Sequence, residues 1–290
     1  MHLIGFQKSK TCILSDFRYF YYLCIKHLGF MKKFFCLSLA ALTLLSVSCK
    51  KDDKPGKGKY GVDGVTPLPE AVDLGTVVNG KNIKWASFNL GASKEYEYGD
   101  YYACGEIATK SDYSWATYTY ANGAYNKLTK YCPKDKTDYW DVADKDPDGE
   151  VTLLPSDDVA HVKLGGKWRM PTLDEINALL ALQTNDDYTW EKWVLATDEN
   201  GTEITDAWGN VVRGIRITRK STGATLFLPA SGYCNGASIG EDAGSWGRYW
   251  SSSLLTDSPS YACRLGFDSK ASGWDSSRRC CGLAVRPVSE

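Results

Sequence analysis

Histidine is scarce in this chain, and that scarcity limits the chemistry available to it. Only three histidines occur among 290 residues, and two of them, His2 and His27, precede the export signal described below. A processed chain would keep His161 alone, within a predicted helix, and no G-x-S-x-G nucleophile motif surrounds a serine. Because acid–base and nucleophilic catalysis rely so often on histidine, the sequence predicts a protein that is not an enzyme and needs no cofactor.

The chain also lacks an excess of charge of either sign. Its 34 basic and 35 acidic residues leave a formal net charge of −1. A nucleic-acid-binding domain would show a basic face, so we expect no nucleic-acid partner. Aromatic residues, in contrast, are plentiful, with 10 Trp and 18 Tyr. Such side chains serve both apolar cores and binding surfaces, and composition alone leaves these two uses open.

The apolar run near the N-terminus is too short to span a bilayer comfortably, and its flanks predict a lipoprotein signal. From Met31 the chain reads MKKFFCLSLAALTLLSVSC, with two lysines, an apolar stretch and small residues before Cys49. The pattern resembles a bacterial lipoprotein signal with a relaxed lipobox. We therefore expect cleavage before Cys49 and lipidation of its thiol. A plain secretory signal is the alternative.

Four segments follow from this reading of the chain. Residues 1–30 fit no targeting pattern and are interpreted as a start codon assigned too early, and residues 31–48 are the signal peptide. Residues 49–67, rich in Lys, Gly, Pro and Asp, predict a lipidated flexible tether. Residues 68–290 predict one domain. The KKDDK after Cys49 resembles the tract that sends lipoproteins of Bacteroidetes-type bacteria to the outer face of the outer membrane, although a solvated linker would look similar.

Periodicity within residues 68–290 predicts an α+β fold with antiparallel sheets. Alternating residues on both sides of Asn79-Gly80 predict a hairpin with strands 71–78 and 83–89. Two helices are expected next, and short alternating segments then predict several strands, among them 211–218 and 224–229.

The stretch GGKWRMPTLDE, residues 165–175, lies between the two predicted helices. The first helix is expected to start at Ser156 as N-cap and to end at Gly165. Thr172 and Glu175 form a capping box for the second helix. Trp168 and Met170 alternate around Arg169 and are predicted to fill the core. Arg169 alone is left without a local role.

Six motifs occur in an order that resembles a known domain family. They are IKWASFNLGA, YGDYYACGE, GGKWRMPTLDE, FLPASGY, RYWSSS and GLAVRPV. The family is named for the major paralogues of Fibrobacter succinogenes, is abundant in secreted proteins and lipoproteins of Bacteroidetes, and is similar to the C-type-lectin-like fold. The resemblance covers about residues 71–290. It implies a compact domain whose first and last strands lie together, but it implies no activity, because the family has no established catalytic residues.

An acidic segment offers weak calcium candidates. In DKDPDGE, Asp144, Asp146 and Asp148 occupy the first, third and fifth positions of a calcium loop, but Pro155 stands where a bidentate Glu belongs. A solvated acidic loop is therefore the preferred interpretation, and no metal is expected. The sugar-binding signatures of C-type lectins, Glu-Pro-Asn or Gln-Pro-Asp with a downstream Trp-Asn-Asp, are absent, so the sequence does not support calcium-dependent sugar binding.

The segment from residue 231 to residue 250 is the predicted contact surface. It is rich in Gly and Ser and carries four aromatic ligand-binding candidates, Tyr233, Trp246, Tyr249 and Trp250. Aromatic side chains on the loops of a rigid frame are typical of binding hot spots. The alternative is that Tyr249 and Trp250 begin the next strand and face the core.

Six cysteines lie in residues 68–290, an even number that permits disulfides in an exported protein. If YACRLGFDS and SRRCCGLAV are the arms of a hairpin that turns between Ala271 and Ser272, Cys263 stands opposite Cys280. That pair is the candidate disulfide, and a one-residue slip would exchange Cys280 for Cys281. Formylglycine-generating oxidases of the wider fold use a cysteine pair, but RRCCGLAV does not reproduce their surrounding sequence.

The sequence thus predicts a lipid-anchored cell-surface binding or adhesion module without catalytic activity, attached to the outer membrane and facing the exterior. Its ligand is expected to be a glycan, a host protein or another surface protein. A structural subunit of a surface assembly such as a pilus tip is the alternative, and an oxidase of the formylglycine-generating type is a remote one.

Overall fold

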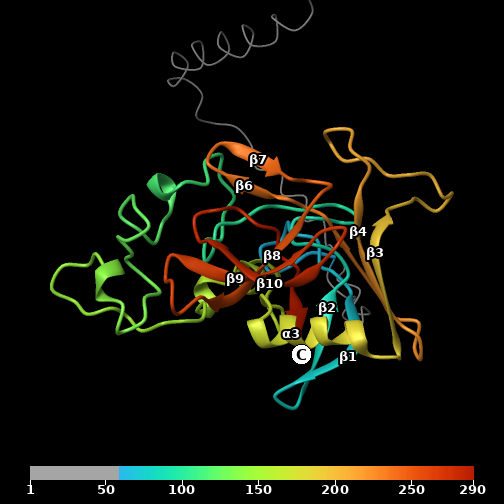
Figure 1. Cartoon of the computed structure of the whole chain (residues 1–290), viewed down its shortest axis with the longest axis horizontal. Coiled ribbons are helices and arrows are strands. Elements are labelled where there is room, and N and C mark those ends of the chain that lie inside the picture. The colour runs from blue at the N-terminus through green and yellow to red at the C-terminus, as the bar shows by residue number, and fades with distance from the viewer. Residues whose placement is uncertain (1–58) are drawn as a thin grey trace, which may run out of the picture. The chain divides into compact units, whose positions relative to one another are not determined.

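The computed structural model describes residues 59–290, which belong to one compact unit (Figure 1). Residues 1–30, the predicted signal peptide, Cys49 and the start of the predicted tether lie outside the described residues. Among the described residues, no helix has both the length and the apolar character needed to cross a membrane.

The first hairpin and the last strand of the chain share one sheet. Strands β1 (Ala71–Val78) and β2 (Lys81–Ala86) are joined by Asn79 and Gly80. Both turn residues have positive φ, 51° and 77°, as a two-residue type I′ turn requires. β11 (Val288–Ser289) pairs with β2 on its other side, and Figure 1 shows the C-terminus beside this hairpin. The predicted turn is confirmed, and so is the expectation that the first and last strands of the domain lie together, although β2 ends three residues earlier than predicted.

The remaining strands build three further antiparallel sheets, which makes four within residues 59–290. Their bounds are β3 (Tyr188–Leu195), β4 (Arg213–Arg219) and β5 (Thr225–Pro229) in one sheet, β6 (Tyr233–Asn235) and β7 (Ser238–Glu241) in a hairpin, and β8 (Gly247–Leu254), β9 (Tyr261–Phe267) and β10 (Ser272–Arg278) in the last. Two α-helices, α2 (Val159–Leu164) and α3 (Leu173–Ala181), complete the regular structure of the described residues together with the 3-10 helices η1 (Trp115–Thr117), η2 (Thr137–Tyr139), η3 (Pro155–Asp157) and η4 (Leu182–Thr184). The predicted α+β fold is confirmed.

The two α-helices differ in how well local sequence predicted their starts. α3 begins at the predicted capping box, in which Thr172 Oγ1 accepts from the Glu175 amide at 3.3 Å and Glu175 Oε2 accepts from the Thr172 amide at 2.8 Å. The predicted N-cap of α2, Ser156, is wrong. Pro155 opens the short η3 turn, so the α-helix starts later, with Asp158 accepting from the His161 amide.

Strand β8 separates two large apolar clusters. Tyr249 faces the cluster that α3 covers, together with Leu74, Ile176 and Phe267. Trp250, the next residue, faces the other cluster, which is built on α2 and on the long loops after β2. Since successive side chains of a strand point to opposite faces, one strand can serve two cores. Much of the aromatic content of the chain is therefore core.

Two arginines near the C-terminus are fully buried, and each is surrounded by oxygen atoms. Arg286 donates to Asn89 Oδ1 at 2.7 Å, to the Ala86 carbonyl at 3.0 Å and to the Phe227 carbonyl at 2.9 Å. Burial lowers the pKa of Arg286 to about 10, which still leaves the guanidinium protonated at neutral pH. One side chain thereby joins the end of β2, the loop that follows it and β5.

Arg279 likewise joins separate segments, here the long loops on the other side of β8. Its guanidinium donates to Tyr118 Oη at 3.0 Å and to the carbonyls of Lys130, Tyr131 and Pro259 at 3.0–3.2 Å. These loops run from residue 87 to residue 154 and contain only short 3-10 helices as regular structure. Because backbone carbonyls are the acceptors, the arginine fixes the path of the chain itself.

Residues 59–67 are folded, so the predicted tether is shorter than expected. Asp63 Oδ1 accepts from the amides of Val65 and Thr66, and the Asp63 amide donates to the Lys163 carbonyl of α2 at 3.3 Å. The contact is close, because a Cβ on Gly61 would lie 2.3 Å from that carbonyl oxygen. The prediction of a flexible tether over 49–67 is wrong for this final part, since a side-chain-capped turn packs it onto α2.

The predicted Cys263–Cys280 disulfide is also wrong. Asp268 Oδ1 accepts from the amides of Lys270 and Ala271, both at 2.7 Å, and centres the β9–β10 turn between residues 269 and 270. This register places Ser276 opposite Cys263, while Cys280 lies beyond the end of β10. The six cysteines of residues 59–290 are buried free thiols.

A substitution tests the role of the Arg286 side chain. We expect Arg286→Met to lower the free energy of unfolding by about 3 kcal/mol or more, because it leaves one amide oxygen and two carbonyls buried without a donor. Urea denaturation measures the change. The matched control is Arg278→Met, which replaces an exposed arginine and should cost less than about 1 kcal/mol. Equal costs for the two variants would contradict the role given to Arg286.

Candidate functional site

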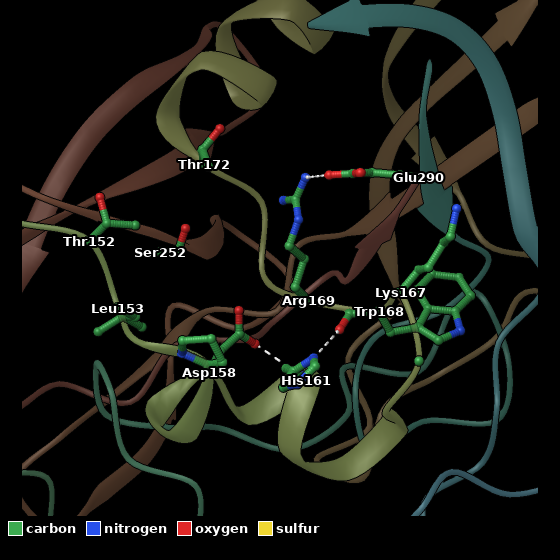
Figure 2. A pocket seen from close by; sticks show the side chains of 12 residues that line it. Thr152, Leu153, Asp158, His161, Lys167, Trp168, Arg169, Thr172, Ser252 and Glu290 are labelled. Atoms are coloured by element: carbon green, nitrogen blue, oxygen red, sulfur yellow. Dashed lines mark hydrogen bonds and ion pairs between the residues drawn. The ribbon is translucent and has the colours of Figure 1, made fainter. Parts of the chain in front are cut away.

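A hollow of about 350 Å³ lies where α2, the start of α3 and the C-terminal residue meet, and we call it the Arg169 pocket (Figure 2). Its volume is within the range of small-molecule sites. The lining residues are Thr152, Leu153, Pro155, Asp158, His161, Gly166, Lys167, Trp168, Arg169, Thr172, Ser252 and Glu290. The stretch GGKWRMPTLDE, whose function the sequence left open, supplies its central wall.

Backbone pairing places this stretch beside the end of the chain. Gly165 and Gly166 both have positive φ, 70° and 59°, and turn the chain sharply after α2. The Arg169 amide then donates to the Val288 carbonyl at 3.0 Å, and the Val288 amide donates to the Arg169 carbonyl at 2.8 Å. Arg169 and Glu290 therefore meet although 121 positions separate them.

The Arg169 side chain, which had no local explanation, is a long-range ion-pair partner. Its Nη1 and Nη2 donate to the two carboxylate oxygens of Glu175 at 2.8 and 2.6 Å. Nη2 also donates to Glu290 Oε1 at 3.1 Å, and Figure 2 shows the guanidinium reaching across the pocket to Glu290. Hydrogen bonds to Glu175 raise the pKa of Arg169. Because Glu175 also caps α3, the arginine links the helix start to the chain end.

Asp158 and His161 form the floor of the pocket. The Asp158 carboxylate accepts from the His161 amide at 3.0 Å and from the Met170 amide at 2.8 Å. Its burial raises its pKa despite these bonds. His161 Nδ1 lies 3.3 Å from the Trp168 carbonyl and so serves as a donor there. The carboxylate contacts backbone amides rather than the imidazole, which is typical of a helix cap and not of an acid–base pair.

Hydroxyl groups line one side of the pocket, and an indole and a lysine line the other. Thr152, Thr172 and Ser252 bring hydroxyl groups, and in Figure 2 they lie on one side of Arg169. Trp168 and Lys167 lie on the other side. The pocket thus offers donors, acceptors and an apolar surface within one small volume.

The predicted core role is confirmed for Met170 and only in part for Trp168. Met170 is fully buried in the cluster beneath α2. Trp168 packs against the same cluster but is partly exposed and lines the pocket. The Trp168 indole therefore lines the pocket with one part of its surface and packs on the core with another.

Two of the four predicted ligand-binding aromatics are not available to a ligand. Tyr249 is 2% exposed and donates to the Pro229 carbonyl, and Trp250 is 0% exposed with its Nε1 donating to the Tyr102 carbonyl at 2.7 Å. The prediction that they contact a ligand is wrong, because they lie within strand β8 and face the two cores. The alternative, a strand with buried aromatics, is confirmed.

The other two, Tyr233 and Trp246, remain at the surface but outside the Arg169 pocket. The Arg248 guanidinium carbon lies 3.9 Å from the centre of the Tyr233 ring and 5.6 Å from that of Trp246. Arg248 is held in turn by Asp242 at 3.0 Å. The two aromatic rings therefore share an internal cation–π contact, and the four predicted residues do not form one site.

The three calcium candidates do not form a site. Asp148 accepts from the amides of Tyr131, Cys132 and Glu150, so its carboxylate organises the loop. Asp144 and Asp146 are exposed. Within residues 59–290 no three His, Cys, Asp or Glu side chains are grouped so as to hold a metal ion. The Asp148 carboxylate is occupied by backbone amides, and Pro155 stands where the pattern needs a bidentate Glu.

Comparison of the chain with family models, with curated proteins and with solved structures yields no match. Sequence reasoning singled out Thr172 and Arg169 but missed Thr152, Ser252 and Glu290. These come from other segments, and only the three-dimensional pairing brings them to the pocket.

The ion pair at the pocket can be tested by substitution. We expect Arg169→Met to lower the free energy of unfolding by about 3 kcal/mol, because it leaves the Glu175 carboxylate buried without its cation. Glu290→Gln should cost less than about 1 kcal/mol, since that pair is partly exposed. Chemical denaturation of both variants distinguishes the two contacts. If Glu290→Gln were as costly as Arg169→Met, the chain end and not Glu175 would be the main partner.

Proposed function

We propose that the protein is a lipid-anchored surface binding module whose ligand occupies the Arg169 pocket. The observation that carries the proposal is the pocket itself, in which hydroxyl groups, a histidine and a tryptophan converge from separate segments of a tightly held frame. Few, well-placed polar groups around an apolar wall are typical of ligand sites. The proposal includes no catalytic step.

The balance of charge around the pocket favours a neutral, polyhydroxylated ligand such as a saccharide. Arg169 is neutralised by Glu175 and Glu290, and the Asp158 carboxylate is bound by backbone amides. What remains for a ligand is a set of hydroxyl donors and acceptors beside the Trp168 indole, with the exposed Lys167 ammonium at the margin, and the formal charges of Arg169, Lys167, Asp158, Glu175 and Glu290 nearly cancel. A sugar presents the same mixture of hydroxyl groups and apolar ring faces.

We further propose that the domain belongs to the paralogous family that its six motifs resemble, with a C-type-lectin-like fold, and that Cys49 anchors it to the outer membrane facing outward. The α+β architecture, with the first hairpin beside the last strand, is compatible with this assignment. Such an anchor would place the Arg169 pocket where extracellular glycans are accessible.

A glycan array with residues 50–290 tests the binding function. We expect retention of at least one glycan class, and Thr152→Trp, which fills the pocket from an exposed position, should weaken it by about tenfold or more. Thr202→Trp is the matched control, because Thr202 is exposed on a loop outside the pocket. The proposal fails if no glycan is retained or if the two variants behave alike. Stoichiometric co-purification with other surface proteins would favour the structural-subunit alternative.

Membrane fractionation tests the anchor. Cys49→Ala should release the protein from membranes or stop its processing, because the acylated thiol would be missing. Mass spectrometry of the native protein should find an N-terminal peptide that begins at modified Cys49. An unmodified peptide spanning residues 47–51 would contradict the proposal.

A further inference from the structure

A second hollow, of about 370 Å³, shares no lining residue with the Arg169 pocket. It lies between residues 96–101 and the loop from residue 204 to residue 212, and we call it the Trp208 hollow. Four aromatic residues line it, Tyr96, Tyr98, Tyr101 and Trp208. The Tyr98 and Trp208 rings are nearly parallel, 23° apart, with their centroids separated by 6.4 Å.

Trp208 is exposed, yet it is firmly held. Asp206 Oδ1 accepts from the amides of Trp208 and Asn210 at 2.9 and 2.8 Å, which fixes the tip of the loop. The indole rests on Gly240 of β7, where an added Cβ would lie 2.5 Å from its Cη2 atom. Even so, 53% of Trp208 is accessible to solvent. A rigid, half-open aromatic surface loses little freedom when it binds a ligand.

The charges around the Trp208 hollow have one sign. Glu97 and Asp206 line it, and none of its lining residues is a lysine, arginine or histidine. Burial raises the pKa of Tyr98 and of Tyr101, so both phenols are neutral at physiological pH. Two carboxylates and four aromatic rings together attract a cation.

The hydrogen-bonding capacity of those carboxylates is largely occupied. Asp206 Oδ2 accepts from Asn210 Nδ2 at 3.2 Å and from the Tyr98 hydroxyl at 3.4 Å, in addition to the two amides on Oδ1. Glu97 Oε2 accepts from the amides of Ser93 and Lys94 and from the Ser93 hydroxyl. Three of the four carboxylate oxygens are thereby occupied and only Glu97 Oε1 is left, so the carboxylates contribute charge more than acceptor sites. A sugar or a primary ammonium would need free acceptors, whereas a quaternary ammonium group has no N–H to satisfy.

We propose that the Trp208 hollow binds a quaternary, fully methylated ammonium group, seated among the aromatic rings and attracted by Glu97 and Asp206. Trp208 and Tyr96 supply the accessible rings of this grouping, and the nearly buried Tyr98 and Tyr101, 9% and 8% exposed, lie behind them. Groups of aromatic rings recognise such cations. The site does not depend on what the Arg169 pocket binds, and it gives the protein a second, chemically different contact.

Isothermal titration of the full chain with choline tests the site, with 3,3-dimethylbutan-1-ol as the uncharged carbon isostere. We expect saturable binding of choline, and at least about tenfold weaker binding of the isostere, because the isostere keeps the shape and loses the charge. Absence of choline binding, or equal affinity for the two compounds, would overturn the proposal. Binding of glucose or galactose in place of choline would also overturn it.

Matched variants locate the binding. Trp208→Ala should weaken choline binding about fivefold or more, while Trp274→Ala, which removes an equally exposed indole from β10, should leave it unchanged. Glu97→Gln keeps every aromatic ring and should weaken the binding of choline but not that of the isostere. This second variant gives a result even if Trp208→Ala does not fold. Choline affinity that is unchanged in Glu97→Gln, or reduced equally in Trp274→Ala, would refute the assignment.

Discussion

The burial of the Arg286 guanidinium is the constraint on which most of this structure depends. A cation in a core is tolerated only when its donors are satisfied, and here the acceptors are backbone carbonyls and one amide rather than a carboxylate. The acceptors belong to β2, to the loop after it and to β5, so all three must be in place before the arginine can be buried. Arg279 imposes the same condition on the loops of residues 118–131. Two side chains from residues 279–286 thus fix the backbone conformation of the long irregular loops between β2 and η3.

Residues 279–286 are followed directly by β11 and then by Glu290, which lines the Arg169 pocket. Val288 pairs with β2 on one side and with Arg169 on the other, and Glu290 then meets the Arg169 guanidinium. The geometry of the pocket is consequently linked to the final residues of the chain. The Arg169–Glu290 pair orients the groups around it more than it stabilises the fold, because both of its side chains are partly exposed.

Features whose cause is local were predictable from the sequence. The Asn79-Gly80 turn and the Thr172–Glu175 capping box each depend on a few neighbouring residues, and both are present. The start of α2 was missed because Pro155 inserts a 3-10 turn, and the register of β9 and β10 was missed because Asp268 fixes an earlier turn. The candidate site was less predictable still. Ser252, Thr152 and Glu290 reach the Arg169 pocket through pairings between distant segments, and no spacing along the chain encodes such pairings.

The folded turn of residues 59–67 has a mechanical consequence. It lies between the N-terminal part of the chain and β1. Bonds from Gly61 to Thr66 and from Leu68 to Lys59 close the turn, while its attachments to α2 are the Asp63–Lys163 backbone bond, an Asp63–Lys163 ion pair at 3.9 Å and close packing at Gly165. Tension applied from the N-terminal side reaches these bonds before it reaches β1, which is paired with β2 near both of its ends. The turn would therefore unfold first. Its residues would then extend, and this extension would take up the applied displacement before force reaches the sheets.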